Sequence, residues 1–330
     1  SIGSGKSHAV KIFKNICKEK EIDAIFLNVD DIRRNILNEA KIDRVQLNKK
    51  IYNDEKAMKE YKVEGHVSSY LPEGKEWKLV FADEFDGPEL DTTKWNFRMN
   101  YWGEPNPAYT DQGIRFDGKS NIELHRTERD GYYVSPQLET GYNSFDIPLG
   151  TQNNPWGQTY FWKLGVLPKP QFMHRFGYYE CRCKFQKYPE EMWSAFWTQS
   201  PSIGTAYDPE WCGVESDIME CFHDGKATTG NIMGGYGTQY RNSGRVQYDL
   251  KETEDGYHTF AMLWEPDKYT FYCDGEIVSE DSLHVSQVPQ FILLTTEVQG
   301  YRSKKPVAVK DGKFVDDAFI VDYVRVFDEV

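Results

Sequence analysis

Short runs of aromatic and β-branched residues dominate the chain from about Trp77 onward. Examples are "WKLVF" at 77–81 and "YTFYC" at 269–273, and Gly, Pro, Asn or Asp separate such runs. Short strands divided by turn residues are typical of an all-β sandwich. The chain also has nine Trp, 21 Tyr and 19 Phe, enough to fill a core and line a binding surface. We therefore predict one large all-β domain over residues 77–330.

Residues 1–63 have a different composition, rich in Lys, Ile, Asn and Asp and without Trp or Pro. The run "SHAVKIFKNICKEK" at 7–20 has apolar residues at helical spacing, and "DAIFLNVDD" at 23–31 reads as a short buried strand. This pattern predicts a small α/β or helical fragment. Residues 64–76 read as a linker between this fragment and the β domain.

The first residues, "SIGSGKS", contain the end of a phosphate-binding loop. In such loops backbone N–H groups and a Lys hold phosphates at a helix N-terminus. Gly5, Lys6 and Ser7 match the end of the pattern, but its first Gly and the preceding strand are not in the sequence. The alternative is that Gly3 to Ser7 simply begins a helix.

The N-terminal part resembles dephospho-CoA kinase in "SIGSGKS", in "NVDDIRRNIL" at 28–37 and in "IDRVQLNKKIYNDEKAMKEY" at 42–61. The resemblance covers about 60 residues and lacks most of the later sheet and the lid. We therefore expect residues 1–63 to be a partial kinase-like fragment without nucleotide catalysis.

The net charge of −13 argues against nucleic acid and against an anionic membrane surface as partners. No run approaches the roughly 18 apolar residues that span a bilayer, and no signal peptide is visible. The six Cys do not form a disulfide scaffold in a chain this long. No C-x-x-C pair suggests zinc, and we expect no required cofactor.

Three acids lie in "VESDIMEC" at 214–221, which reads as a strand. Strand side chains alternate faces, so Glu215 and Asp217 share a face while Glu220 points the other way. One β-bulge would bring Glu220 onto the same face, and bulges are common beside active sites. We predict a bulge near Ile218 or Met219. The alternative is a solvated acidic edge strand.

Two carboxyl groups about 5–5.5 Å apart perform retaining glycoside hydrolysis. One attacks the anomeric carbon, and the other protonates the leaving oxygen and later activates water. With a bulge, Glu215 and Glu220 would face one cleft. Asp217 would lie within hydrogen-bonding reach of Glu215 and influence its protonation.

The preceding run, "EMWSAFWTQ" at 191–199, places Trp193 and Trp197 on one strand face with Ala195 between them. Such rings suit a platform for sugars, although core packing is the alternative. Trp211, just before the acidic strand, is a third candidate for substrate binding.

Other candidates are weaker. Tyr101 and Trp102 in "MNYWGEPNPAY" would form a further subsite or pack in the core, and His223 would bind sugar or lie in a turn. His258 reads as a structural hydrogen-bonding residue. The long segment at 144–174, rich in Gly, Pro and aromatics, reads as an inserted loop at the cleft rim.

Residues from about Trp77 to Val330 resemble glycoside hydrolase family 16 in ordered blocks. The blocks are "WKLVFADEFDGPELDTTKW", "GYYECRCKFQKYPEEMWSAFWTQ", "ESDIME" in its longer, bulged form, "DGYHTFAMLWEPDKYTFYCDGEIV" and "FIVDYVRVF". The resemblance implies a concanavalin A-like jelly-roll β-sandwich and retaining hydrolysis of internal β-linkages in polysaccharides. It implies that Glu215 is the nucleophile, Asp217 its assisting acid and Glu220 the general acid/base.

The resemblance also implies other properties. Trp193 and Trp197 would line sugar subsites, and some family members carry a structural calcium, for which Asp322 is a candidate ligand. Family members are usually secreted or on the cell surface. The chain departs from the family pattern at Ser216, at Gly234 and Gly235, and in the cleft strand at Thr296 and Glu297. These departures concern the substrate rather than the acid trio.

The first expected substrate is a laminarin-type β-1,3-glucan, because the bulged signature is typical of that branch. A β-galactan or mucin-type β-galactoside is an alternative. A non-catalytic carbohydrate-binding protein on the same fold is the rival of another class.

Overall fold

The computed structural model describes residues 58–146, 164–206, 208–236 and 240–330. The chain divides into two units, Ser1–Asp54 and Glu55–Val330, and the description below concerns the second. The predicted phosphate-binding loop and almost all of the kinase-like fragment lie outside the described residues, so that expectation stays a prediction. Within the described ranges, no helix is both long and apolar enough to cross a membrane.

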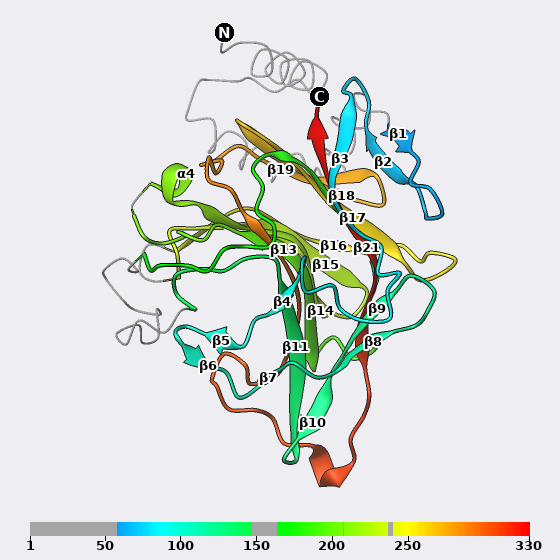
Figure 1. Cartoon of the computed structure of the whole chain (residues 1–330), viewed down its shortest axis with the longest axis vertical. Helices are drawn as coiled ribbons and strands as arrows, with labels where there is room; N and C mark the ends of the chain where they lie inside the picture. Colours follow the sequence, from blue (N-terminus) through cyan, green and yellow to red (C-terminus); the bar gives the residue numbers. More distant parts are fainter. Residues whose placement is uncertain (1–57, 147–163, 207, 237–239) are drawn as a thin grey trace, which may run out of the picture. The chain divides into compact units, whose positions relative to one another are not determined.

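Two antiparallel sheets form the β domain (Figure 1). The first has the order β10-β11-β20-β13-β14-β15-β16, with β4 antiparallel and β7 parallel to β11. Its strands are β4 Asn96–Phe97, β7 Tyr109–Thr110, β10 Thr127–Arg129, β11 Tyr132–Glu139, β13 Met192–Gln199, β14 Val214–His223, β15 Lys226–Met233, β16 Arg241–Asp249 and β20 Phe291–Val298.

The second sheet has the order β19-β18-β17-β12-β21-β9-β8, with β3 paired to β21. Its strands are β3 Trp77–Asp83, β8 Ile114–Phe116, β9 Ile122–His125, β12 Gly177–Lys184, β17 His258–Glu265, β18 Lys268–Cys273, β19 Glu276–Asp281 and β21 Ala318–Glu329. Smaller elements are the pair β5 Asn100–Tyr101 and β6 Glu104–Pro105, the short helix α4 Pro209–Cys212 and the 3-10 turn η1 Lys310–Gly312.

The main hydrophobic core lies between the two sheets. It contains Phe196 and Ile218 from the first sheet and Phe260 and Val324 from the second, all fully buried. Each sheet buries one face against the other because alternate side chains on its strands are apolar. The predicted all-β sandwich is therefore confirmed.

Residues before Trp77 also belong to this domain. β1 Met58–Tyr61 pairs with β2 Ser69–Pro72 as an antiparallel hairpin. Leu71 is buried in a cluster with Tyr178 and Phe327. The structure thus corrects the predicted linker at 64–76, because it contains strand β2, whose Leu71 packs on the outer face of the second sheet. Its partners lie more than 100 residues away in sequence, which is why local composition did not reveal the contact.

Candidate active site

A β-bulge interrupts strand β14 at Ile218. Toward β13, Phe196 pairs with Met219 and the next residue, Trp197, pairs with Asp217. Ile218 therefore has no partner in that ladder, and its side chain is buried in the core between the sheets. The predicted bulge is confirmed.

The bulge brings the three acids of β14 onto one face. Glu215, Asp217 and Glu220 all line a single cleft of about 410 Å³. The cleft lies over five neighbouring strands of the first sheet, β20, β13, β14, β15 and β16, and over flanking loops. Its wall is rich in aromatic and charged side chains; apart from the acid trio, the lining residues are Arg98, Tyr101, Trp102, Phe145, Trp193, Ala195, Trp197, Phe222, Ile232, Tyr236, Tyr240, Asn242, Arg245, Thr295, Glu297, Tyr301 and Arg302.

Glu215 is buried and held by two hydrogen-bond donors. Gln199, its register partner on β13, donates from Nε2 to Oε2 of Glu215 at 2.9 Å. The hydroxyl of Tyr236 donates to the same oxygen. Burial, followed by the charge of Glu220, raises the pKa of Glu215 to about 8, while the Gln199 bond lowers it. The two donors favour the ionised carboxylate that a nucleophile needs.

Asp217 and Glu220 complete the acidic group. Asp217 lies within hydrogen-bonding reach of Glu215, as its position on the strand predicted. Burial raises the pKa of both Asp217 and Glu220 well above the ordinary range; the charge of Glu215 adds to the effect on Asp217, and that of Asp217 to the effect on Glu220. Three buried carboxyls this close cannot all be ionised at neutral pH, so the group as a whole retains at least one proton.

Among the described residues, Arg245 on β16 is the cation within ion-pair distance of these acids. Its Nη2 lies 3.2 Å from Oε2 of Glu220, and its Nη1 lies 3.8 Å from Oδ2 of Asp217. A register shift between β15 and β16 at Gly230 places Arg245 there. A Cβ on Gly230 would lie 2.7 Å from the Cα of Arg245, and φ of this glycine is +151°, so only glycine permits this approach.

The structure places the predicted residues of β13 on one face of the cleft, and their role as a platform for sugars stays a prediction. Trp193, Ala195 and Trp197 all line the cleft, while Phe196 faces the core. Trp197 donates from Nε1 to the hydroxyl of Thr295 at 3.0 Å. These side chains obey the period of two that the sequence predicts for a strand.

Tyr101 and Trp102 also line the cleft. Their rings stack with centroids 4.1 Å apart, and both residues are largely buried. The backbone N–H of Trp102 donates to Asp146, which also accepts from Nε of Arg98 at 2.6 Å. The expected packing is therefore confirmed, and the two rings also form part of the cleft wall, while their role as a sugar subsite stays a prediction.

The inserted segment predicted at 144–174 is described only in part. Phe145 lines the cleft and makes an edge contact with Tyr236. Residues 147–163 lie outside the described residues, so the rest of the expected rim loop stays a prediction.

Two predicted substrate-binding residues are not in the cleft. Trp211 is 67% exposed on α4, and it is absent from the cleft lining. His223 lies at the far end of β14, where Nδ1 contacts Glu190 at 3.1 Å. The prediction is wrong for Trp211 because α4 turns its side chain to solvent before β14 begins. His223 directly follows Phe222, which lines the cleft, so the alternation of strand side chains points His223 away from it.

Strand β20 also requires a correction. Thr295 and Glu297 line the cleft, whereas the sequence interpretation placed Thr296 and Glu297 there. Alternate residues of one strand face opposite sides, so Thr296 points away from the cleft.

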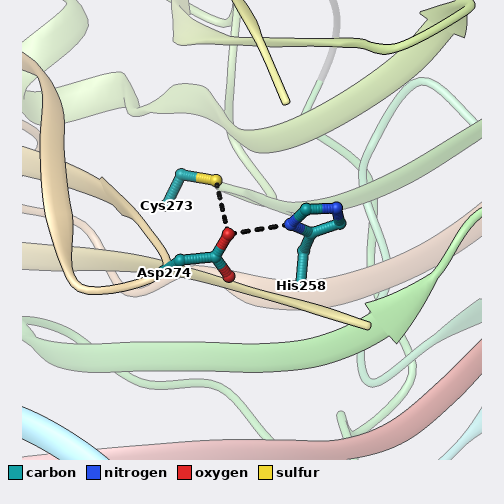
Figure 2. A group of neighbouring side chains, drawn as sticks. All are labelled: His258, Cys273 and Asp274. Atoms are coloured by element: carbon teal, nitrogen blue, oxygen red, sulfur yellow. Dashed lines mark hydrogen bonds and ion pairs between the residues drawn. The ribbon is translucent and has the colours of Figure 1, made fainter. Parts of the chain in front are cut away.

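His258 has the structural role that the sequence predicted. Asp274 accepts from Nδ1 of His258 and from the backbone N–H of Thr259, both at 2.8 Å, and so ties β17 to the β18–β19 turn. Figure 2 shows these side chains with Cys273, whose Sγ lies 3.7 Å from the same carboxylate. The donor atoms lie within 4.8 Å of one another. Burial raises the pKa of the Cys273 thiol, however, which disfavours the thiolate that a metal would require.

Asp322 does not suit the expected calcium. Its carboxylate receives a hydrogen bond from Nη1 of Arg182 at 2.5 Å. A guanidinium at this distance occupies the carboxylate and repels a divalent cation. Among the described residues, no group of three His, Cys, Asp or Glu donors includes Asp322, whereas calcium needs six or more oxygens.

Sequence reasoning missed several cleft residues. Tyr236 and Arg245 contact acids of the cleft, and Arg302 contacts the ring of Trp193. No motif in the neighbouring sequence marks these three residues as part of a site. The glycine at 230, inside an otherwise regular strand pattern, was the one local sign of a close backbone approach beside Arg245.

Comparison with known proteins agrees with this geometry. Residues 152–303 match the family model described as Glycosyl hydrolases family 16. Glucan endo-1,3-beta-glucosidase A1 of Niallia circulans is 24% identical over 207 residues, covering 60% of this chain and 28% of that protein. Beta-porphyranase B of Phocaeicola plebeius is 23% identical over 311 residues, covering 82% of this chain and 91% of that protein.

Among solved structures, the catalytic domain of an endo-1,3-beta-glucanase (laminarinase) from Thermotoga petrophila is similar, with a TM-score of 0.56 and 22% identity. The match covers 77% of this chain and 99% of that one. At this identity the likeness confirms the jelly-roll fold. The family model and the named relatives support a glycoside hydrolase. The chain spans little more than a quarter of the length of the Niallia relative.

Proposed function

We propose that this chain is a retaining, endo-acting glycoside hydrolase that cleaves internal β-linkages of a polysaccharide by double displacement. The observation that carries the proposal is the bulge at Ile218. It places Glu215, Asp217 and Glu220 on one face of β14, inside an aromatic cleft.

In the first step the carboxylate of Glu215 attacks the anomeric carbon. Glu220 donates its proton to the glycosidic oxygen as the bond between that oxygen and the anomeric carbon breaks. The products are an ester between Glu215 and the sugar and a free shortened chain.

In the second step Glu220, now ionised, removes a proton from water. The water oxygen attacks the anomeric carbon, and Glu215 departs as a carboxylate. Two inversions at one carbon retain the β-configuration, and both side chains return to their starting protonation states.

The surroundings suit these roles. The donors Gln199 and Tyr236 stabilise ionised Glu215, and they would also stabilise it as a leaving carboxylate. Asp217 has a strongly raised pKa because of burial and the charge of Glu215. Asp217 is suited to hold a proton between the two catalytic groups and to donate it in a hydrogen bond to Glu215.

The cleft supports endo action because it accommodates several sugars. Trp193 and Trp197 are four strand residues apart, which corresponds to about 13 Å. Both line the same cleft as the acids. A cleft of this length has room for more than one sugar unit, as endo action requires.

A laminarin-type β-1,3-glucan is the first substrate proposed, supported by the glucan endo-1,3-beta-glucosidase relatives in Niallia and Cryptopygus. A β-galactan or mucin-type β-galactoside is the second candidate. It is supported by relatives named beta-porphyranase and kappa-carrageenase. The arginines in this cleft also support it where the sugars carry anionic groups, because guanidinium groups bind oxyanions. The complete acid trio disfavours a purely carbohydrate-binding role.

The test is product release from a panel of β-glucans and β-galactans by the full chain, Glu215→Gln and Glu220→Gln. We expect one polymer to be cut to oligosaccharides, with both substitutions abolishing cleavage. Proton NMR of the first product should show the β-anomer before mutarotation. Full activity in either Gln variant would contradict the proposal, and binding without cleavage by the unchanged chain would favour the carbohydrate-binding role.

A further inference from the structure

Arg302 differs from the other two arginines of the cleft in its partners. Arg98 is paired with Asp146 at 2.6 Å, and Arg245 with Glu220 at 3.2 Å. Arg302 donates from Nε to the hydroxyl of Tyr301 at 2.6 Å. Among the described residues, no carboxylate oxygen lies within 4.0 Å of the Arg302 guanidinium, which is the limit for an ion pair. No carboxylate there accepts a hydrogen bond from either Nη atom of Arg302.

The guanidinium of Arg302 lies over the ring of Trp193, with its carbon 4.6 Å from the ring centroid. The centroid of the Phe222 ring lies 4.6 Å from that of the Trp193 ring, and the Tyr301 ring approaches Trp193 edge-on with centroids 6.2 Å apart. Trp193 is therefore not the bare sugar platform that the sequence suggested. Its ring positions a cation, and cation–π contact and the Tyr301 bond fix the direction of the free N–H groups.

This cation lies next to the proposed acid/base. Ala195 pairs with Glu220 across β13 and β14, and Trp193 is two residues before Ala195 on β13. That spacing corresponds to about 7 Å. Trp197 pairs with Asp217 on the other side, so Arg302 lies on the Glu220 side of the cleft, away from Glu215. A substituent on a sugar near the reacting bond would reach it.

We propose that Arg302, held on Trp193, is an anion subsite, and that the natural substrate is a β-linked polysaccharide whose sugars carry an anionic group, a sulfate ester or a carboxylate. The inference rests on the proposed glycosidase function and narrows its substrate class. A planar guanidinium with free N–H groups binds such oxyanions through paired hydrogen bonds. A neutral glucan would offer it only hydroxyl oxygens, which accept hydrogen bonds without the added attraction of an opposite charge.

The acids near Arg302 do not oppose this assignment. Glu297 and Glu220 are the carboxyls whose charges interact with Arg302. Burial raises the pKa of both groups, which reduces the negative charge they present to an incoming anion. The net −13 of the chain would otherwise repel an anionic polymer, so binding one requires a local cation of this kind.

The test compares one sulfated β-galactan with the same polymer after chemical desulfation, together with laminarin and a polyuronate. The full chain is assayed as wild type, Arg302→Gln, Arg302→Lys and Lys310→Gln. Lys310 is an exposed cation outside the cleft lining, so its variant controls for net charge. Cleavage is followed by reducing ends, and binding by affinity electrophoresis in gels containing each polymer.

We expect kcat/KM for one anionic polymer to exceed that for its neutral counterpart by about tenfold or more, as a charge-assisted hydrogen bond provides. Arg302→Gln should bring the rates on the two polymers to within about a factor of two of each other, whatever its effect on the absolute rates, and Arg302→Lys should restore the preference in part. Added salt should weaken it. Comparison of the rates on the sulfated galactan and on the polyuronate identifies whether a sulfate ester or a carboxylate is bound.

Equal rates on both polymers and no effect of Arg302→Gln would overturn the subsite, while the glycosidase proposal would stand if Glu215→Gln abolishes cleavage. If no polymer is cut, the glycosidase proposal fails and the gels still decide the subsite. The subsite would be supported if an anionic polymer slows the migration of the wild-type protein and of Lys310→Gln but not that of Arg302→Gln. Equal slowing of all variants would reject the subsite.

Discussion

Nη2 of Arg245 lies 3.2 Å from Oε2 of Glu220, the proposed general acid/base, although the two residues come from strands separated by β15. The contact depends on Gly230 in that intervening strand, which allows β16 to approach. A cation at this distance stabilises the ionised carboxylate and so opposes the burial that keeps Glu220 protonated.

Arg245→Gln should therefore change the pH dependence of hydrolysis. Arg245 lowers the pKa of Glu220, so its removal raises that pKa and extends the protonated, acid-competent form to higher pH. The basic limb of kcat/KM should move to higher pH, and Arg245→Lys should move it less. Arg241→Gln on the same strand, outside the cleft lining, is the control; an unmoved limb in Arg245→Gln would show that Arg245 does not act on Glu220.

Tyr236→Phe should lower kcat while leaving the fold intact. The substitution removes a hydroxyl that donates to Oε2 of Glu215. A hydrogen bond to a charged group contributes about 1.5–3 kcal/mol, which corresponds to a loss of roughly 10- to 100-fold in kcat. Tyr70→Phe, at an exposed tyrosine on β2, should have no effect. Unchanged kcat in Tyr236→Phe would remove this residue from the catalytic account.

Gly230→Ala should destabilise the protein and impair catalysis together. The new Cβ would lie 2.7 Å from the Cα of Arg245 on the neighbouring strand, at a φ of +151°. We expect a loss of about 1–3 kcal/mol in the free energy of unfolding by urea. Gly225→Ala, at φ +64° with nothing within 4 Å, tests backbone strain alone and should cost less and leave activity unchanged. Equal effects of the two substitutions would argue against a steric role for Gly230.

Glu180→Gln should flatten the pH dependence of stability. Glu180 is fully buried and accepts from Ser69 and Tyr323 at 2.6 and 2.7 Å. Burial raises its pKa from 4.5 to about 7. The folded state therefore holds a proton that the unfolded state has lost, and this contribution is complete below pH 4.5 and disappears as the pH rises through about 7. Thermal unfolding at pH 4.5, 6 and 7.5 should show a smaller fall for the variant; identical slopes would mean that Glu180 ionises normally.

Much of the site followed from the sequence of single strands. The odd spacing from Glu215 to Glu220 required a bulge if both were to face one cleft, and the ladder shows it at Ile218. Trp193 and Trp197 share their face because strand side chains alternate with a period of two. Trp211 could not be placed in this way, since it precedes the strand and its direction depends on α4.

The sequence by itself thus determined the all-β class, the strand that carries the acids and the face on which they lie. Only the tertiary structure decided that Arg245, Tyr236 and Arg302 complete the cleft, and that Leu71 on β2 belongs to the same domain. The physical reason is that contacts along one strand follow from backbone geometry, which is local. Contacts between strands depend on the order and register of pairing over a hundred or more residues, and no local pattern encodes them.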